Sequence, residues 1–160
     1  MTVVDTPALL ANRLTQEGDK TIAFFRVISP SGWDQLVYNE GAKWNVQHIL
    51  AHFVATEKAV SILITDIMAG GFGAPDNFDI NSFNEKEVIS LKNQSPEDLL
   101  NRLSELRLTN IMIVSGMNPG DLAKTGKHPY FGSAALIDII KLLYRHHQIH
   151  IRDIRRVLPV

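Results

Sequence analysis

Residues 45–69 read NVQHILAHFVATEKAVSILITDIMA and join an apolar stripe to two histidines. The apolar residues recur at i, i+3, i+4 and i+7, the spacing of one helical face; they are Val46, Ile49, Leu50, Phe53, Val60, Ile64 and Ile67. Gly70 and Gly71 follow the stripe and predict the end of the helix. A helix with one apolar face buries that face against other elements, so this stretch predicts a helical bundle.

Two further stretches repeat the helical period and carry clear start signals. A helix is predicted over 7–28, where Thr6 is the expected N-cap and Pro7 suits the first helical position. Another is predicted over 95–116, which opens with SPED and has Ser95 as its cap. Both stretches are long enough to pack along the whole length of the helix over 45–69.

A fourth helix is predicted over 133–157, with Ser133 as its cap. Residues 71–94 form a crossover between the second and third helices that is longer than a connection between neighbouring helices needs. No strand pattern competes with these helices, and no repeat or linker divides the chain. The sequence therefore predicts an all-α four-helix bundle with a long crossover between helices 2 and 3, in a single domain over 1–160.

The composition is that of an ordinary globular protein: 45% of the 160 residues are hydrophobic, 21% are charged, and the net charge is −1. No run approaches the ~18 apolar residues of a membrane span, and the first residues lack the basic segment of a signal peptide. The chain has no cysteine, which excludes disulfides, thiolate metal ligands and a cysteine nucleophile. We expect a cytoplasmic protein that binds no membrane and, because its net charge is near zero, no nucleic acid.

The last predicted helix carries LYRHHQIHI at 143–151, which places three histidines on its apolar side. His146 and His150 are four residues apart, so their imidazoles lie one above the other and can converge on one divalent ion. His52, at the edge of the stripe in 45–69, supplies a third inward histidine. Three histidines leave one coordination position open, which is typical of a catalytic metal site. His147 has no assigned role.

Other interpretations of these residues stay open. The histidines of the last helix can instead be core residues satisfied by hydrogen bonds. His48 forms a competing i, i+4 pair with His52 at a more exposed position, Glu57 is either a fourth ligand or a buried partner, and His128 is a loop residue or faces a pocket. The motifs HExxH and Glu-x-x-His do not occur, which excludes a zincin peptidase and argues against a di-iron carboxylate bundle.

Four segments resemble, in this order, the motifs of the DinB/YfiT-like superfamily: WNVQHILAHFVATE (44–57), NSFNE (81–85), GKHPYFG (126–132) and HHQIHIRDI (146–154). The resemblance extends over nearly the whole chain from about residue 7. It implies a four-helix bundle that holds one divalent metal, zinc or nickel foremost, on His52, His146 and His150. Studied members are metal-dependent thiol S-transferases or isomerases that use a low-molecular-weight thiol, and the family often forms homodimers.

The chain departs from this pattern at Asp153, where members commonly carry glutamine. Asp153 either supports a ligand imidazole from behind or pairs with Arg152 or Arg156 at the surface. The hypothesis is a metal-dependent transferase or isomerase with a small-molecule substrate, in which the metal activates a water or a thiol co-substrate. The crossover and the 118–132 loop then frame the substrate pocket. The alternative is a non-catalytic, metal-stabilised binding or stress-response module.

Overall fold

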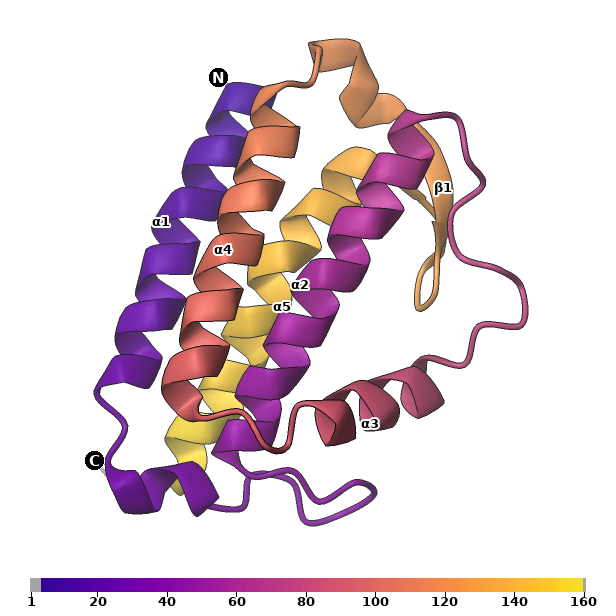
Figure 1. Cartoon of the computed structure of the whole chain (residues 1–160). Coiled ribbons are helices and arrows are strands. Elements are labelled where there is room, and N and C mark those ends of the chain that lie inside the picture. Colours follow the sequence, from indigo (N-terminus) through magenta and orange to yellow (C-terminus); the bar gives the residue numbers. More distant parts are fainter. Residues whose placement is uncertain (1–3, 160) are drawn as a thin grey trace.

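The computed structural model describes residues 4–159 and consists mainly of helices (Figure 1). Four long helices form the bundle: α1 (Pro7–Arg26), α2 (Val46–Met68), α4 (Pro96–Ser115) and α5 (Leu136–Val157). Helix α1 contacts α4 and α5, and α2 contacts the same two helices, so the order around the bundle is α1, α4, α2, α5. The predicted all-α four-helix bundle is confirmed.

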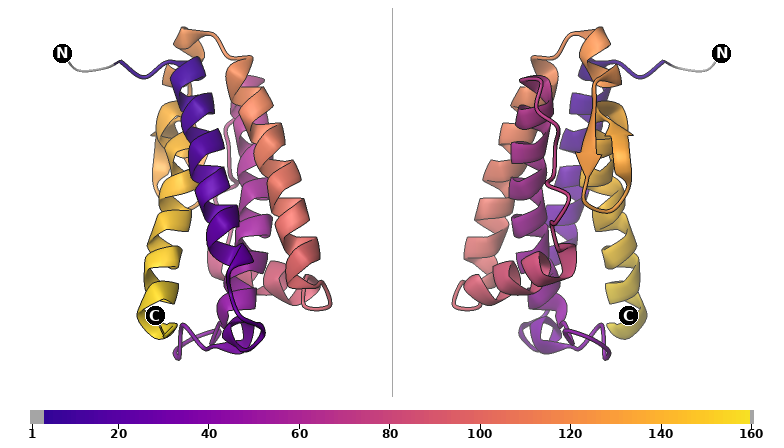
Figure 2. Two further views of the ribbon diagram at one scale, coloured as in Figure 1. Left: turned by 90° about the vertical axis from the view of Figure 1, so that its left-hand side faces the viewer. Right: turned by 90° about the vertical axis from the view of Figure 1, so that its right-hand side faces the viewer.

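The long crossover makes α2 and α4 parallel. After α2 the chain returns along the outside of the bundle to the end where α2 began, and α4 starts there (Figure 1). The right-hand view of Figure 2 looks onto this face, where the crossover lies over α2 and a hairpin lies over α5. The crossover contains a helix that the sequence analysis missed, α3 (Ile80–Ser90), which is capped by the Asp79 carboxylate. Only Val88 of α3 is buried, so the apolar period that would predict a helix is weak.

The expectation that no strands compete with the helices is wrong at one place. After the short 3-10 helix η2 (Pro119–Ala123), strands β1 (Thr125–His128) and β2 (Gly132–Ala135) form an antiparallel hairpin. Its residues are small or polar, so neither β-branched nor alternating apolar residues mark it in the sequence. A second 3-10 helix, η1 (Pro30–Asp34), follows α1.

The predicted helix caps are confirmed in two cases and corrected in one. Thr6 accepts a hydrogen bond from the Leu9 N–H, and Ser95 forms a reciprocal capping box with Asp98. Ser133, in contrast, lies inside β2, and α5 begins three residues later without a side-chain cap. The hairpin replaces the cap, because the Leu136 N–H donates to the backbone carbonyl of Lys124.

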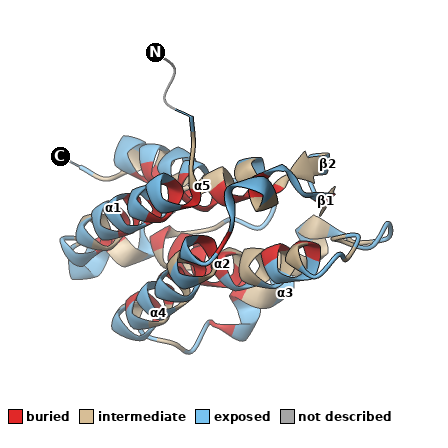
Figure 3. Cartoon of the chain, turned by 90° about the horizontal axis from the view of Figure 1, so that it is seen from above, coloured by how far each residue is buried: buried red, intermediate tan, exposed pale blue. Residues whose placement is uncertain are grey.

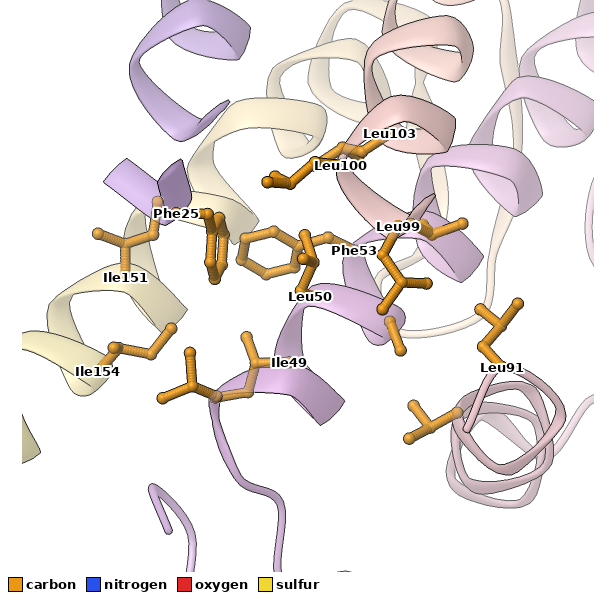
Figure 4. Packing of buried hydrophobic residues seen from close by; sticks show 14 residues of the cluster. Phe25, Ile49, Leu50, Phe53, Leu91, Leu99, Leu100, Leu103, Ile151 and Ile154 are labelled. Carbon is orange, nitrogen blue, oxygen red and sulfur yellow. The ribbon is translucent and has the colours of Figure 1, made fainter. Parts of the chain in front are cut away.

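The buried residues of the long helices face the interior of the bundle (Figure 3). They form two apolar clusters, with buried polar side chains between them. Figure 4 shows one cluster, in which the fully buried rings of Phe25 and Phe53 lie together, with centroids 5.8 Å apart. The other cluster includes Leu14, Ile64 and Ile139. Between the two clusters, α2, α4 and α5 each place buried polar side chains at mid-length: Glu57, Arg107, Asn110 and His147. This layer lies next to the site described below.

The expectation that no segment has the length and apolar character of a membrane span is wrong for α2. It has an 18-residue window of mean hydropathy 1.2, enough by length and composition for a span. Half of that window is buried inside the structure, and the helix forms the centre of the core, as Figure 4 shows for Ile49, Leu50 and Phe53. Burial in the bundle explains its apolar character.

Candidate metal centre

The structure brings together the three histidines that the sequence singled out. His52 projects from α2, and His146 and His150 project from α5, the helix beside it. The Nε2 atoms of His52 and His146 are 3.0 Å apart, as are those of His146 and His150. One ligand atom from each residue lies within 4.8 Å of the other two. The three imidazoles therefore point their Nε2 edges at one another.

Aromatic rings wall in this three-histidine cluster. The indole of Trp44 lies against His52, with ring centroids 4.8 Å apart. The ring of Phe53 lies beneath, 5.8 Å from both His146 and His150. These apolar walls remove water from the imidazoles, and burial disfavours the charged form of a histidine.

All three imidazoles are consequently neutral at physiological pH. Burial, followed by the proximity of the other two histidines, holds the pKa of His52 well below its usual value. Burial also lowers the pKa of His146 to about 3. The pKa of His150 is lowered by burial as well, although the nearby Asp153 carboxylate opposes the shift. A neutral imidazole is the form that binds a metal.

The geometry of the cluster fits a divalent ion. Two nitrogens at 2.0–2.1 Å from a common ion are about 2.8–3.0 Å apart at octahedral angles and about 3.3–3.4 Å apart at the tetrahedral angle. The two Nε2 separations, 3.0 Å each, fall within this span. Hydrogen bonds between neutral imidazoles cannot account for both close contacts, because His146 Nε2 lies near two other ring nitrogens and carries at most one proton. In addition, His52 Nδ1 is buried without a hydrogen-bond partner within residues 4–159. The three residues can therefore hold a metal.

A tyrosine that the sequence analysis missed supports the cluster from behind. The Tyr38 hydroxyl lies 2.7 Å from His150 Nδ1 and donates to Asp153 Oδ2 at 2.8 Å. Because the hydroxyl proton goes to the carboxylate, the Tyr38 oxygen accepts from Nδ1–H, which leaves His150 Nε2 bare and facing the cluster. Burial and the Asp153 hydrogen bond raise the pKa of Tyr38, so the hydroxyl stays protonated.

The Asp153 carboxylate makes contacts on two sides. One oxygen contacts Tyr38, while the other lies 3.5 Å from Arg152 and 3.4 Å from Arg156. Asp153 thus reaches the cluster through the Tyr38 hydroxyl and does not touch the imidazole. No periodic signal marks Tyr38, which lies in the loop before α2, where the Val37 and Tyr38 N–H groups both donate to the Trp44 carbonyl.

Glu57 and His147 belong to the polar layer of the core. Glu57 accepts two hydrogen bonds from Arg107, at 2.6 and 3.0 Å, and one from Asn110. Of the two roles left open for Glu57, the structure shows the buried partner. The His147 ring is stacked on Phe53 at 3.9 Å, and burial and the Arg107 charge hold its pKa well below the usual value. His48 is also outside the cluster, since its Nδ1 accepts the Asn45 N–H in a capping box.

A cavity of about 340 Å³ opens beside the cluster. Both His52 and His146 line it, so the imidazoles face open space on this side. The crossover contributes Ile80 and Asn84 to its wall, and the hairpin contributes His128, Tyr130 and Phe131 at its tip, so the two connecting segments frame the cavity as the sequence analysis expected. The volume falls in the range of sites for small molecules.

Fold and site together define the class: a four-helix bundle whose three-histidine cluster, able to hold a metal, borders a small cavity. The DinB superfamily model matches residues 7–154, and the chain therefore belongs to this superfamily. No curated protein sequence matches the chain.

Two solved structures share the fold. An uncharacterised protein from Escherichia coli UTI89 superposes with a TM-score of 0.75 at 14% identity, covering 98% of this chain and 95% of the other. YfiT from Bacillus subtilis, described as a probable metal-dependent hydrolase with an unusual four-helix bundle topology, superposes with a TM-score of 0.74 at 18% identity. That match covers 92% of this chain and 85% of YfiT. At these identities the likeness establishes the fold.

Proposed function

We propose that the protein is a metal-dependent enzyme that transfers a low-molecular-weight thiol to a small-molecule substrate, or isomerises the substrate with the help of that thiol. The observation that carries the proposal is the cluster of three neutral imidazoles, two of which, those of His52 and His146, line a cavity. When bound, a divalent ion supplies a Lewis acid that lowers the pKa of a thiol or water nucleophile. Zinc and nickel are the proposed metals, since both accept imidazole ligands.

The residues of the chain divide the work in this proposal. His52, His146 and His150 hold the metal, and Tyr38 orients His150 through its Nδ1 atom. Trp44 and Phe53 exclude water around the imidazoles, which strengthens electrostatic interactions in the site. The chain offers no thiol of its own, since it has no cysteine. The sulfur nucleophile must therefore come from a co-substrate.

Hydrolysis is the second candidate. It is favoured by the structural likeness to YfiT, which is described as a probable metal-dependent hydrolase. The same cluster serves both reactions, because a metal activates water and thiols by the same lowering of pKa. A non-catalytic, metal-stabilised module is the third possibility.

We further propose that the protein works in the cytoplasm and forms a homodimer. Analytical ultracentrifugation tests the oligomeric state.

The metal is tested first. We expect about one equivalent of zinc or nickel per chain in the purified protein by elemental analysis. His150→Ala should lose it, because the cluster then offers only two imidazoles. His48→Ala is the matched control, since His48 lies outside the cluster and should leave metal content unchanged. Equal metal content in wild type and His150→Ala would disprove the three-histidine site.

The reaction is tested next, with the metal-loaded protein. Bacillithiol, mycothiol and glutathione are each offered with an electrophilic chromogen, and 4-nitrophenyl acetate is offered alone. Product that requires both a thiol and an intact His150 supports the transferase. Ester hydrolysis without a thiol, with no thiol transfer, supports the hydrolase. Metal binding without either activity supports the non-catalytic module.

A further inference from the structure

The cavity beside the three-histidine cluster has an uncharged, mainly apolar wall. Aliphatic and aromatic side chains line most of it, among them Val60, Ile80, Phe131, Leu142 and Leu143. Glu57 is the one acidic residue among the lining residues, and its carboxylate is paired with the Arg107 guanidinium in the polar layer. Within the described chain, the wall therefore offers no unpaired charge to a ligand. Such a wall favours an uncharged, largely apolar molecule.

His128 brings a polar group to this wall with a fixed tautomer. Its Nδ1 accepts the backbone N–H groups of Tyr130 at 3.1 Å and Phe131 at 3.3 Å. Because both partners are donors, Nδ1 must be bare, and the proton of the neutral imidazole is on Nε2. Burial lowers the pKa of His128, which keeps the ring neutral. The opposite ring edge, which carries Nε2–H, makes no hydrogen bond within the described residues, and His128 lines the cavity.

The position of His128 is fixed by the crossover. The Lys127 N–H donates to the Phe72 carbonyl and the Lys127 carbonyl accepts from the Ala74 N–H, both at 2.8 Å. Gly73, with φ of 88°, makes this contact possible, since a Cβ there would lie 2.5 Å from the Lys127 backbone. His128 is also near the cluster, because it lines the same cavity as His52 and His146. A rigid donor near reacting atoms can orient a substrate.

We propose that the His128 Nε2–H group donates a hydrogen bond to the substrate, an uncharged, largely apolar molecule with a carbonyl-type oxygen, and so orients it against the three-histidine cluster. The inference rests on the proposed function for the reaction itself, and it adds the substrate class and the residue that selects it. Within the described residues, the hydrogen bonds of the His128 ring use only Nδ1, so Nε2–H is available.

Ligand-observed ¹⁹F NMR on the metal-free full chain tests the proposal. The probes are 4-fluoroacetophenone, which has the carbonyl oxygen, 4-fluoroethylbenzene, which has a similar shape without it, and 4-fluorobenzoate, which is charged. The readout is the Kd of the hydrocarbon divided by that of the ketone. His128→Asn keeps an acceptor near the position of Nδ1 and removes the cavity donor, whereas His128→Gln keeps a donor near the position of Nε2.

We expect the Kd ratio to fall about fivefold in His128→Asn, as expected for loss of one neutral hydrogen bond, and to be largely retained in His128→Gln. The hydrocarbon Kd should change less than twofold in both variants, which shows that the cavity is intact. An unchanged ratio in His128→Asn would overturn the proposal, as would tighter binding of the benzoate than of the ketone. Failure of the hydrocarbon and the ketone to bind the wild type at millimolar concentration would overturn it too.

The result is separable from the proposed function, because binding is measured without metal. A His150→Ala protein that has lost its metal but keeps the Kd ratio would leave this inference standing. Conversely, if the metal-loaded protein transfers a thiol but His128→Asn leaves the Kd ratio unchanged, the inference fails and the proposed function stands.

Discussion

At the residue scale, the Tyr38 hydroxyl supports one imidazole of the three-histidine cluster, that of His150, from a distant part of the sequence. Tyr38 and His150 are 112 positions apart, yet the hydroxyl joins His150 Nδ1 to the Asp153 carboxylate. These two hydrogen bonds fix the tautomer and the ring orientation of His150. Partners of this kind commonly change metal affinity by 10- to 100-fold when removed.

Tyr38→Phe should therefore weaken metal binding about tenfold while the fold is retained. The phenyl ring keeps the packing against His150, but His150 Nδ1 loses its partner and the imidazole can rotate. Competition with a chromophoric chelator for zinc measures the affinity. Tyr130→Phe, on the exposed hairpin tip, is the matched control and should bind zinc as the wild type does.

Asp153→Asn tests whether the carboxylate acts through Tyr38. Alone, it should weaken zinc binding less than Tyr38→Phe, because the hydroxyl still contacts His150. In the Tyr38→Phe background it should add nearly nothing, since the connection is already broken. If the two effects simply add, Asp153 influences the metal directly and the route through the hydroxyl is wrong.

At the element scale, the bundle helices are joined by the polar layer at mid-length as well as by apolar packing. Arg107 of α4 contacts Glu57 of α2 and the backbone carbonyls of Leu14 in α1 and Leu143 in α5. One guanidinium thus links all four bundle helices. It also holds Glu57, and with it the wall of the cavity, in place.

Glu57→Gln should reduce the free energy of unfolding by about 3–5 kcal/mol, because the Arg107 charge is then buried without a counter-charge. Urea denaturation at pH 7 measures the loss. Glu105→Gln, at an exposed position of α4, is the control and should change stability by less than about 0.5 kcal/mol. A loss below about 1 kcal/mol for Glu57→Gln would show that water or another group compensates Arg107.

At the scale of the whole molecule, the buried histidines make stability depend on pH. The pKa values of His52, His146, His147 and His150 are all lowered in the folded state, chiefly by burial. Unfolded histidines take up protons below pH ~6.5, whereas these folded ones take them up only at a lower pH. Their contribution to the free energy of unfolding is complete above pH ~6.5 and falls as the pH drops toward the folded pKa values.

The metal-free protein should accordingly lose stability steadily from pH 7 to pH 4. His146, with a folded pKa of about 3, alone accounts for about 1–2 kcal/mol at pH 5. Urea midpoints between pH 4 and pH 8.5 measure the effect, and the range from 7.5 to 8.5 is the internal control. His146→Gln should make the curve shallower by that amount. A flat curve between pH 7 and pH 5 would contradict the neutral state of the cluster.

Much of the bundle was predictable because its signals are local. The apolar period of 45–69, the caps at Thr6 and Ser95, and the i, i+4 spacing of His146 and His150 depend on residues within a few positions of one another. The same helical period places His52 at the edge of the apolar stripe in 45–69. Those patterns were enough to nominate three residues that the structure brings together.

The four bundle helices and the three histidines can thus be predicted from local patterns, since helical periodicity and capping are properties of neighbouring residues. The contacts of Tyr38 with His150 and of Glu57 with Arg107, and the position of His128 beside the cavity, depend on the tertiary structure. Each of these arises where segments far apart in the chain pack together, as between Glu57 and Arg107, 50 positions apart. Such contacts leave no period in one sequence, because the packing of the whole chain sets them.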